Sequence, residues 1–204
     1  TTWDNHDVLG NTVSGTFTMK GAPHNPSSFA NVSFTQTGAS YTWNDNSNTQ
    51  YQETKFVLRN ASGALIQDNI SSDSTSIDES DLSANTLYTR KICVVNEAGE
   101  TCSNIETFYT KANDPTTASA VSNYTTEDGH AIVLSWNKNG NTTTSVTLSG
   151  TEIFSGSENT LTLTGLTADT NYQFTLYSLN GDGVVNSSFV QASVVTLPQA
   201  PDIS

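Results

Sequence analysis

Hydrophobic and polar residues alternate along most of this chain in short runs, and no stretch repeats apolar residues at helical spacing. Gly-, Asn- and Asp-rich turns separate the runs. Such a succession of short strands predicts an all-β fold, an antiparallel sandwich or barrel. The expected strands lie, in chain order, in FANVSFTQ, SYTWND, ETKFVLRN, LYTRKICVV, IETFYTK, AIVLSW, TSVTLSG, TLTLTGL, YQFTLYSL and SFVQASVVTL.

An internal repeat divides the chain into two similar units. The segment LSANTLY (82–88) matches LTADTNY (166–172) in its leucine, its small polar turn, its threonine and its tyrosine, and a strand follows each. Upstream of each segment one tryptophan closes a strand, Trp43 in SYTWND and Trp136 in IVLSWNK. Recurrence of these markers in the same order predicts two tandem copies of one fold.

These markers resemble the fibronectin type III domain, present twice over roughly residues 23 to 198. Members of that family carry a tryptophan late in strand B and a Leu-x-x-x-Thr-x-Tyr corner between strands E and F. The resemblance implies two tandem, immunoglobulin-like β-sandwiches of a secreted or cell-surface protein, and in particular of a microbial protein. Each corner tyrosine is expected to bury its ring and bond its hydroxyl to the corner backbone. The expected core markers are Trp43, Leu82, Tyr88, Trp136, Leu166 and Tyr172.

Proline-containing junctions at Pro23, Pro115 and Pro201 set the expected domain boundaries, because proline cannot donate to a strand ladder and suits the ends of units. The linker KANDP is expected to hold the two units in an extended rod. The prediction is an N-terminal strand segment over 1–22, fibronectin type III-like domains over 23–113 and 114–198, and a linker toward a further domain over 199–204.

The N-terminal segment NTVSGTFTMK (11–20) resembles a strand G without a domain of its own. Alternation places Val13, Phe17 and Met19 on one apolar face. An unpaired strand exposes backbone N–H and C=O groups, so we expect it to pair within the chain or to complete a neighbouring subunit by strand donation. The alternative is a segment left by a removed preceding domain, which pairs locally or frays.

Cys93 and Cys102 are the two cysteines of the chain. In the fibronectin type III alignment they lie on strands F and G on either side of the turn NEAG, which implies a cross-strand disulfide on the outer face of the hairpin. A disulfide indicates an oxidising, extracellular or cell-surface location, whereas two free thiols in a cytosolic protein are the alternative. The same alternation turns Arg90 inward, where it needs a carboxylate partner or the sandwich rim.

The net charge of −13, with only 7 Lys and Arg, argues against nucleic acid and anionic membrane surfaces as partners. No apolar run approaches the roughly 20 residues that span a bilayer, so no membrane insertion is expected. Candidate N-glycosylation sequons begin at Asn31, Asn60, Asn69, Asn123, Asn141 and Asn186. In a chain this rich in Asn, Ser and Thr many sequons arise by chance, which is the favoured explanation.

Catalytic and metal-binding chemistry find little support. The histidines, His6, His24 and His130, are expected at the surface, and two cysteines supply no zinc ligand set. The acidic stretch SSDSTSIDESD and Asp182 offer oxygen ligands of the kind that calcium binds, but neither matches a recognised calcium loop, and a solvated acidic edge is the favoured interpretation. We therefore expect no enzymatic activity, no cofactor and no metal.

The leading hypothesis is a non-catalytic extracellular structural module: a stalk, an adhesin or a filament subunit that self-associates or contacts other surface proteins. The alternative is an accessory spacer or weak glycan-binding module of a secreted polysaccharide-degrading enzyme. Aromatic residues considered as stacking surfaces for sugars are Trp3, Tyr41, Tyr51, Tyr109, Tyr124 and Tyr177.

Overall fold

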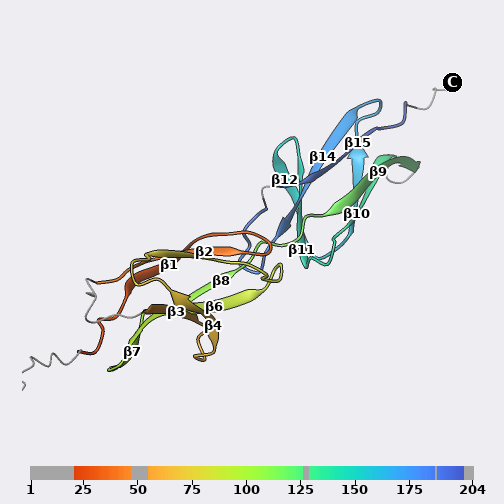
Figure 1. The fold of residues 1–204 in the computed structure, drawn as a ribbon. Coiled ribbons are helices and arrows are strands. Elements are labelled where there is room, and N and C mark those ends of the chain that lie inside the picture. The colour runs from red at the N-terminus through yellow and green to blue at the C-terminus, as the bar shows by residue number, and fades with distance from the viewer. Residues whose placement is uncertain (1–20, 47–54, 126–128, 187, 200–204) are drawn as a thin grey trace, which may run out of the picture.

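Two β-sandwiches follow one another along the chain, end to end (Figure 1). The computed structural model describes residues 21–46, 55–125, 129–186 and 188–199, and the regular structure there consists of antiparallel strands. The predicted all-β fold of two tandem sandwiches is therefore confirmed. The N-terminal strand segment, with Val13, Phe17 and Met19, lies outside the described residues.

The first sandwich packs a three-stranded sheet, β1-β2-β5, against a sheet in which β4, β3, β6 and β7 are neighbours and β8 also pairs with β6. Alternation explains the layers, because inward residues of both sheets meet in one core. Its strands are β1 (Ser27–Phe34), β2 (Ala39–Asn44), β3 (Lys55–Arg59), β4 (Leu65–Ile70), β5 (Ser76–Glu79), β6 (Leu87–Asn96), β7 (Gly99–Cys102) and β8 (Glu106–Tyr109).

The second sandwich has a three-stranded sheet, β13-β10-β9, and a four-stranded sheet, β12-β11-β14-β15. Strand β14 shows the underlying pattern, since every second residue from Phe174 onward is buried. The strands are β9 (Thr116–Thr125), β10 (Gly129–Asn137), β11 (Thr143–Leu148), β12 (Thr151–Gly156), β13 (Thr160–Leu166), β14 (Asn171–Leu179) and β15 (Val190–Val195).

Each sandwich has its own hydrophobic core. Trp43 and Leu82 belong to the first core and are 5% and 7% exposed. Trp136, 4% exposed, belongs to the second, and Leu166 packs partly buried against it. The two core clusters share no residue, so each unit is a separate packing unit.

The corner between β5 and β6 of the first sandwich is built in the same way as the corner between β13 and β14 of the second. The phenol oxygen of Tyr88 accepts a hydrogen bond from the backbone N–H of Ser83 at 2.8 Å. That of Tyr172 accepts from the N–H of Thr167 at 3.1 Å. Both rings pack against their core, so a polar atom that burial would strand finds a partner in the corner backbone.

A buried threonine completes each corner, and the sequence interpretation missed it. The hydroxyl of Thr110 donates to the carbonyl of Ser83 at 2.6 Å and accepts from the N–H of Thr86 at 3.0 Å. Thr196 makes the matching bonds at 2.6 Å and 2.9 Å. A sequence pattern could have identified these threonines, because in both units the final strand ends in a hydrophobic stretch followed by threonine, just before a junction.

Strand β7 was expected only through the placement of Cys102 on strand G, and four further strands were absent from the predicted set: β4, β5, β9 and β12. β5 falls in the stretch interpreted as a solvated acidic edge, yet it pairs with β2 from Ala39↔Glu79 to Thr42↔Ser76. Each of the four lies at an edge of its sheet. Edge strands bury few side chains and carry polar or charged residues, which weakens the alternation that sequence inspection depends on.

The surface positions expected for His130 and Tyr41 are wrong. His130 is 8% exposed at the start of β10, with its ring 5.0 Å from that of Tyr124. Tyr41 is fully buried in the first core. Both share strand parity with an inward tryptophan, His130 with Trp136 and Tyr41 with Trp43, so alternation places them inside.

Candidate functional site: the junction between the sandwiches

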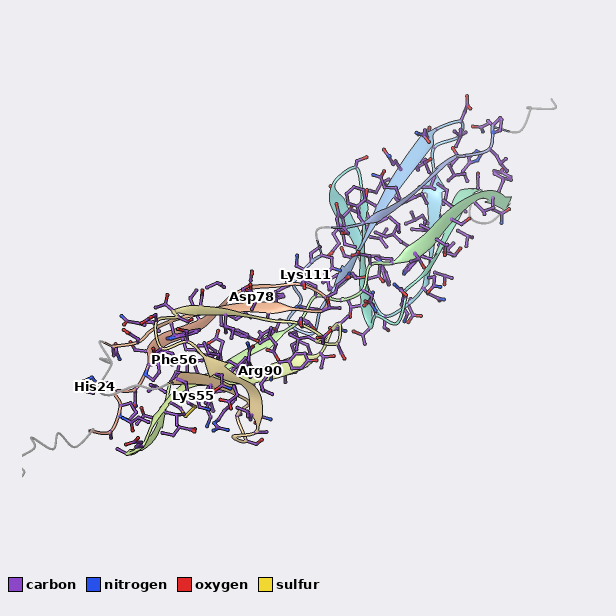
Figure 2. All side chains as sticks on the ribbon, viewed as in Figure 1. His24, Lys55, Phe56, Asp78, Arg90 and Lys111 are labelled. Atoms are coloured by element: carbon purple, nitrogen blue, oxygen red, sulfur yellow. A yellow bond between two sulfur atoms is a disulfide. The ribbon has the colours of Figure 1, made fainter. Side chains whose placement is uncertain are left out.

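The junction consists of the linker 110–115 and the parts of both sandwiches that contact it (Figure 2, where Lys111 is labelled). The start of the linker is bonded to the first sandwich. The N–H of Lys111 donates to the carbonyl of Thr35, and the carbonyl of Lys111 accepts from the N–H of Asn85, both at 2.9 Å. Ala112 is fully buried. The linker is therefore part of a packed interface rather than a free tether.

Four asparagine side chains of the second sandwich, here named the asparagine clasp, bond to the end of the first sandwich and the linker. Asn186 donates from Nδ2 to the carbonyl of Ala112 at 2.6 Å and to Oδ1 of Asp114 at 2.9 Å. Gln36 of the first sandwich donates to the same carbonyl at 3.2 Å and to the other carboxylate oxygen at 3.3 Å. The linker is thus held from both units. The clasp residues are Asn139, Asn141, Asn180 and Asn186.

A turn after β10 supplies two clasp residues. Asn141 donates from Nδ2 to the carbonyl of Asn113 and to Oγ of Ser178, the latter at 2.7 Å. Asn139 and the linker exchange bonds, since Asn139 donates to the carbonyl of Asp114 at 3.2 Å and accepts at its own carbonyl from Asn113 at 3.3 Å. These bonds fix the linker backbone on a second side.

The loop between β14 and β15 reaches the last strand of the first sandwich. Asn180 donates to the carbonyl of Tyr109 at 3.3 Å, and the carboxylate of Asp182 accepts from the N–H of the same tyrosine at 3.3 Å. A Cβ at Gly181 would lie 2.4 Å from the Tyr109 ring, so only glycine permits this approach. Asp182, considered for calcium, is thus a bonding partner across the junction.

The predicted glycosylation residues divide in two groups. Asn141 and Asn186, 5% and 4% exposed, donate their side-chain amides within the junction, and a glycan on either nitrogen would displace those bonds. Asn69 and Asn123 are exposed, while Asn31 and Asn60 are half-buried. A glycan therefore fits the folded chain best at Asn69 or Asn123.

A polar depression also lies at the junction, and its lining residues are Thr35, Gln36, Lys111, Asp114, Asn186 and Ser188.

A buried charged network joins the two sheets of the first sandwich. Arg90, labelled in Figure 2, is 5% exposed and donates from Nε to Oε2 of Glu79 at 2.8 Å. Tyr41 donates its hydroxyl to the same carboxylate at 2.7 Å. Burial, and secondarily the bond to Glu79, raises the pKa of Tyr41 well above its ordinary range. Glu79 is the carboxylate partner that the inward position of Arg90 requires. It lies on β5, one of the strands that the sequence did not predict.

The structure joins Cys93 to Cys102 by a disulfide between directly paired residues of β6 and β7, with Cα atoms 4.0 Å apart. Cys93 lies outside the first core cluster, on the outer face, yet it is fully buried. Arg59 and Glu100 link β3 to β7 across β6 by a bidentate ion pair, at 2.9 and 2.7 Å. Among the described residues these two sulfurs and Glu100 form the one cluster of potential metal ligands. Because the sulfurs are bonded to each other, they offer no thiolate ligands.

The remaining aromatic candidates belong to different elements of the structure. Tyr177 packs edge-on against Phe189, which is 51% exposed, at a ring distance of 5.6 Å. Tyr124 is exposed at the end of β9, and Tyr109 belongs to the junction. Trp3 and Tyr51 lie outside the described residues. Within the part of the chain that the structure describes, no helix is long and apolar enough to span a membrane.

Comparison with known proteins supports the fold. No protein-family model matches the chain. No curated protein matches it either. A two-domain fibronectin type III segment of chicken tenascin is similar in structure, with a TM-score of 0.53 and 19% identity over 85% of this chain and 100% of that one. A central fibronectin-III array of RIM-binding protein aligns over 89% of this chain and 71% of its own, at 16% identity and a TM-score of 0.36. With two cores and two identical corners already in place, the tenascin likeness shows that this chain has the fold of tandem fibronectin type III domains.

Proposed function

We propose that the chain is a non-catalytic structural module of an extracellular or cell-surface protein, in which two sandwiches form one stiff spacer. The asparagine clasp carries this proposal. It bonds linker carbonyls that a flexible connection would leave to water, and Gln36 holds the same linker from the opposite unit. Buried amide bonds of this kind are lost together if the units rotate, so they resist bending.

An extracellular location is supported by the disulfide, because cross-strand disulfides persist in oxidising compartments. The surface composition agrees, since charged residues make up only 13% of the chain and threonine, serine and asparagine dominate. A stalk that sets its neighbours at a fixed distance is the specific role we favour among stalk, adhesin and filament subunit.

Filament assembly by strand donation would require residues 11–20, which lie outside the described residues. The second role, an accessory module of a secreted polysaccharide-degrading enzyme, is favoured by the exposed ring of Phe189, which packs against the half-buried Tyr177, because sugars stack on exposed aromatic faces. Titration of the chain and of Phe189→Ala with soluble polysaccharide fragments separates these roles: loss of a measurable glycan affinity in the variant supports the accessory module.

The test of the spacer is small-angle X-ray scattering on the monomeric chain beside an Asn141→Ala/Asn186→Ala double variant. We expect an elongated, narrow envelope for the chain and increased flexibility for the variant. Asn123→Ala, exposed on β9 away from the junction, is the matched control. A flexible wild-type chain would contradict the proposal. Labelling of intact producing cells with an impermeant reagent checks the location independently.

A further inference from the structure

The chain contains the sequence Asn-Gly twice, at Asn139-Gly140 and Asn180-Gly181, and both asparagines belong to the asparagine clasp. We propose that Asn139 is a site of spontaneous deamidation that loosens the junction, and that the fold protects Asn180 from the same reaction. The chemistry at Asn139 is independent of the proposed function, whereas its effect on a stiff spacer rests on that function.

The reaction needs only water. The backbone nitrogen of Gly140, unhindered by a side chain, attacks Cγ of Asn139, so that a new N–Cγ bond forms while the Cγ–Nδ2 bond breaks. The proton lost from the glycine nitrogen leaves with the departing ammonia. Water then opens the succinimide ring at either carbonyl and yields aspartate or isoaspartate. One water is consumed, one ammonia is released, and nothing is oxidised or reduced.

The turn that holds Asn139 is open to this reaction. Asn139 and Gly140 are exposed, and both have left-handed backbone, with φ of +54° and +82°. Apart from the two adjacent residues, no heavy atom lies within 4 Å of the position that a Cβ of Gly140 would occupy, which leaves room for ring closure and for water. The leaving nitrogen is held by a hydrogen bond to the carbonyl of Asp114 at 3.2 Å, at the long end of the usual range.

The second Asn-Gly pair is held in place. Asn180 is 4% exposed, and its Oδ1 accepts from the N–H groups of Asp182 at 3.1 Å and Val184 at 2.8 Å. Its nitrogen donates to the carbonyl of Tyr109, whose ring covers Gly181. Cyclisation must break these three bonds first, so we expect it to be slower on the order of a hundredfold.

Conversion of Asn139 changes the junction in two ways. An aspartate replaces the donor Nδ2 with an oxygen that faces the carbonyl oxygen of Asp114, and it adds a negative charge to a junction that already holds a carboxylate. An isoaspartate adds a methylene to the backbone two residues before Asn141, which bonds the carbonyl of Asn113. Either product weakens the contact between this turn and the linker.

Peptide mapping of the aged chain tests the chemistry. The folded chain is incubated in mildly alkaline buffer and digested after glutamate, because cleavage at Glu152 and Glu158 puts Asn139 and Asn180 in different peptides. We expect aspartate and isoaspartate at Asn139, with Asn180 intact. In denaturant, where the fold no longer protects either site, the two rates should converge. Absence of conversion at Asn139, or equal rates in the folded chain, overturns the proposal.

A product mimic tests the consequence. Spin labels on the two sandwiches report the distribution of distances between them, and Asn139→Asp should broaden it. Asn123→Asp adds the same charge on exposed β9 and should leave it unchanged. An unchanged distribution in Asn139→Asp overturns the effect on the junction. A distribution that is already broad in the wild-type chain counts against the spacer, while the peptide map still decides the chemistry.

Discussion

The two sandwiches share one topology but are stabilised by different interactions. All three ion pairs found among the described residues, and the disulfide, lie in the first sandwich. The second sandwich, over residues 114–198, has Lys138 as its single Lys or Arg. There the inward tryptophan bonds a neutral partner, with Nε1 of Trp136 donating to Thr144 at 3.2 Å.

This comparison distinguishes the interactions that both sandwiches share, which define the fold, from those that occur in one sandwich and add to its stability. The tyrosine and threonine corner recurs bond for bond in both units. The buried Arg90–Glu79 pair and the disulfide occur once. Each variant below is expected to affect one sandwich or both, according to which class of interaction it removes.

Glu79→Gln should have the largest effect. It leaves the Arg90 guanidinium buried without a negative partner, which costs about 3–5 kcal/mol of unfolding free energy. Hydrogen exchange resolved by peptide should show the first sandwich opening while the second stays protected. Glu158→Gln, at an exposed residue between β12 and β13, is the control and should change little. Equal loss in both sandwiches would contradict their independence.

Reduction of the disulfide should destabilise the first sandwich by about 2–3 kcal/mol, because the bond closes a short loop. The second sandwich contains no cysteine, so its unfolding midpoint should stay the same with reductant. Denaturant unfolding with and without reductant checks this, and a shift in the second transition would be evidence against the assignment.

Thr110→Val and Thr196→Val should produce matched losses, one in each sandwich. Each change removes a buried hydroxyl that both donates and accepts, at a cost of about 1–3 kcal/mol. Thr107→Val, exposed on β8, provides the comparison for the loss of a hydroxyl in itself. If the two variants lost strongly unequal amounts of unfolding free energy, the corners would be similar in geometry but not in the stability they contribute.

Tyr41 should make the first sandwich sensitive to alkali. Its pKa is raised in the folded state, so the stability it contributes is complete below the unfolded tyrosine pKa, about 10, and declines as pH rises above that value. Tyr41→Phe should flatten this decline and cost about 1 kcal/mol at neutral pH for the lost bond to Glu79. Unfolding midpoints across the alkaline range provide the measurement.

The fold could be predicted because its markers are local. Trp43 and Trp136 end strands with clear alternation, and each Leu-to-Tyr corner is contained in a single short segment. Edge strand β5 could not be predicted in the same way, because its charged residues find partners only through pairing with β2 and through Arg90. Long-range pairing decides such strands, and alternation within the strand does not.

The junction was harder to predict for a related reason. Asn141 and Asn186 belong to sequons, so their local sequence indicated modification rather than contact. Their partners, the carbonyls of Asn113 and Ala112, lie 28 and 74 residues away in the chain. Only the proline at position 115 marked the region as a linker, and it could not show that the linker is bonded from both sides.

The most direct test of the stiff junction is a distance measurement between spin labels on Ser62→Cys and Glu158→Cys, exposed positions in the first and second sandwich. The clasp predicts one narrow distance distribution for the otherwise wild-type chain and a broad one once Asn141 and Asn186 are replaced by alanine. A broad distribution in the chain with its clasp intact, or a narrow one after its removal, would contradict the account.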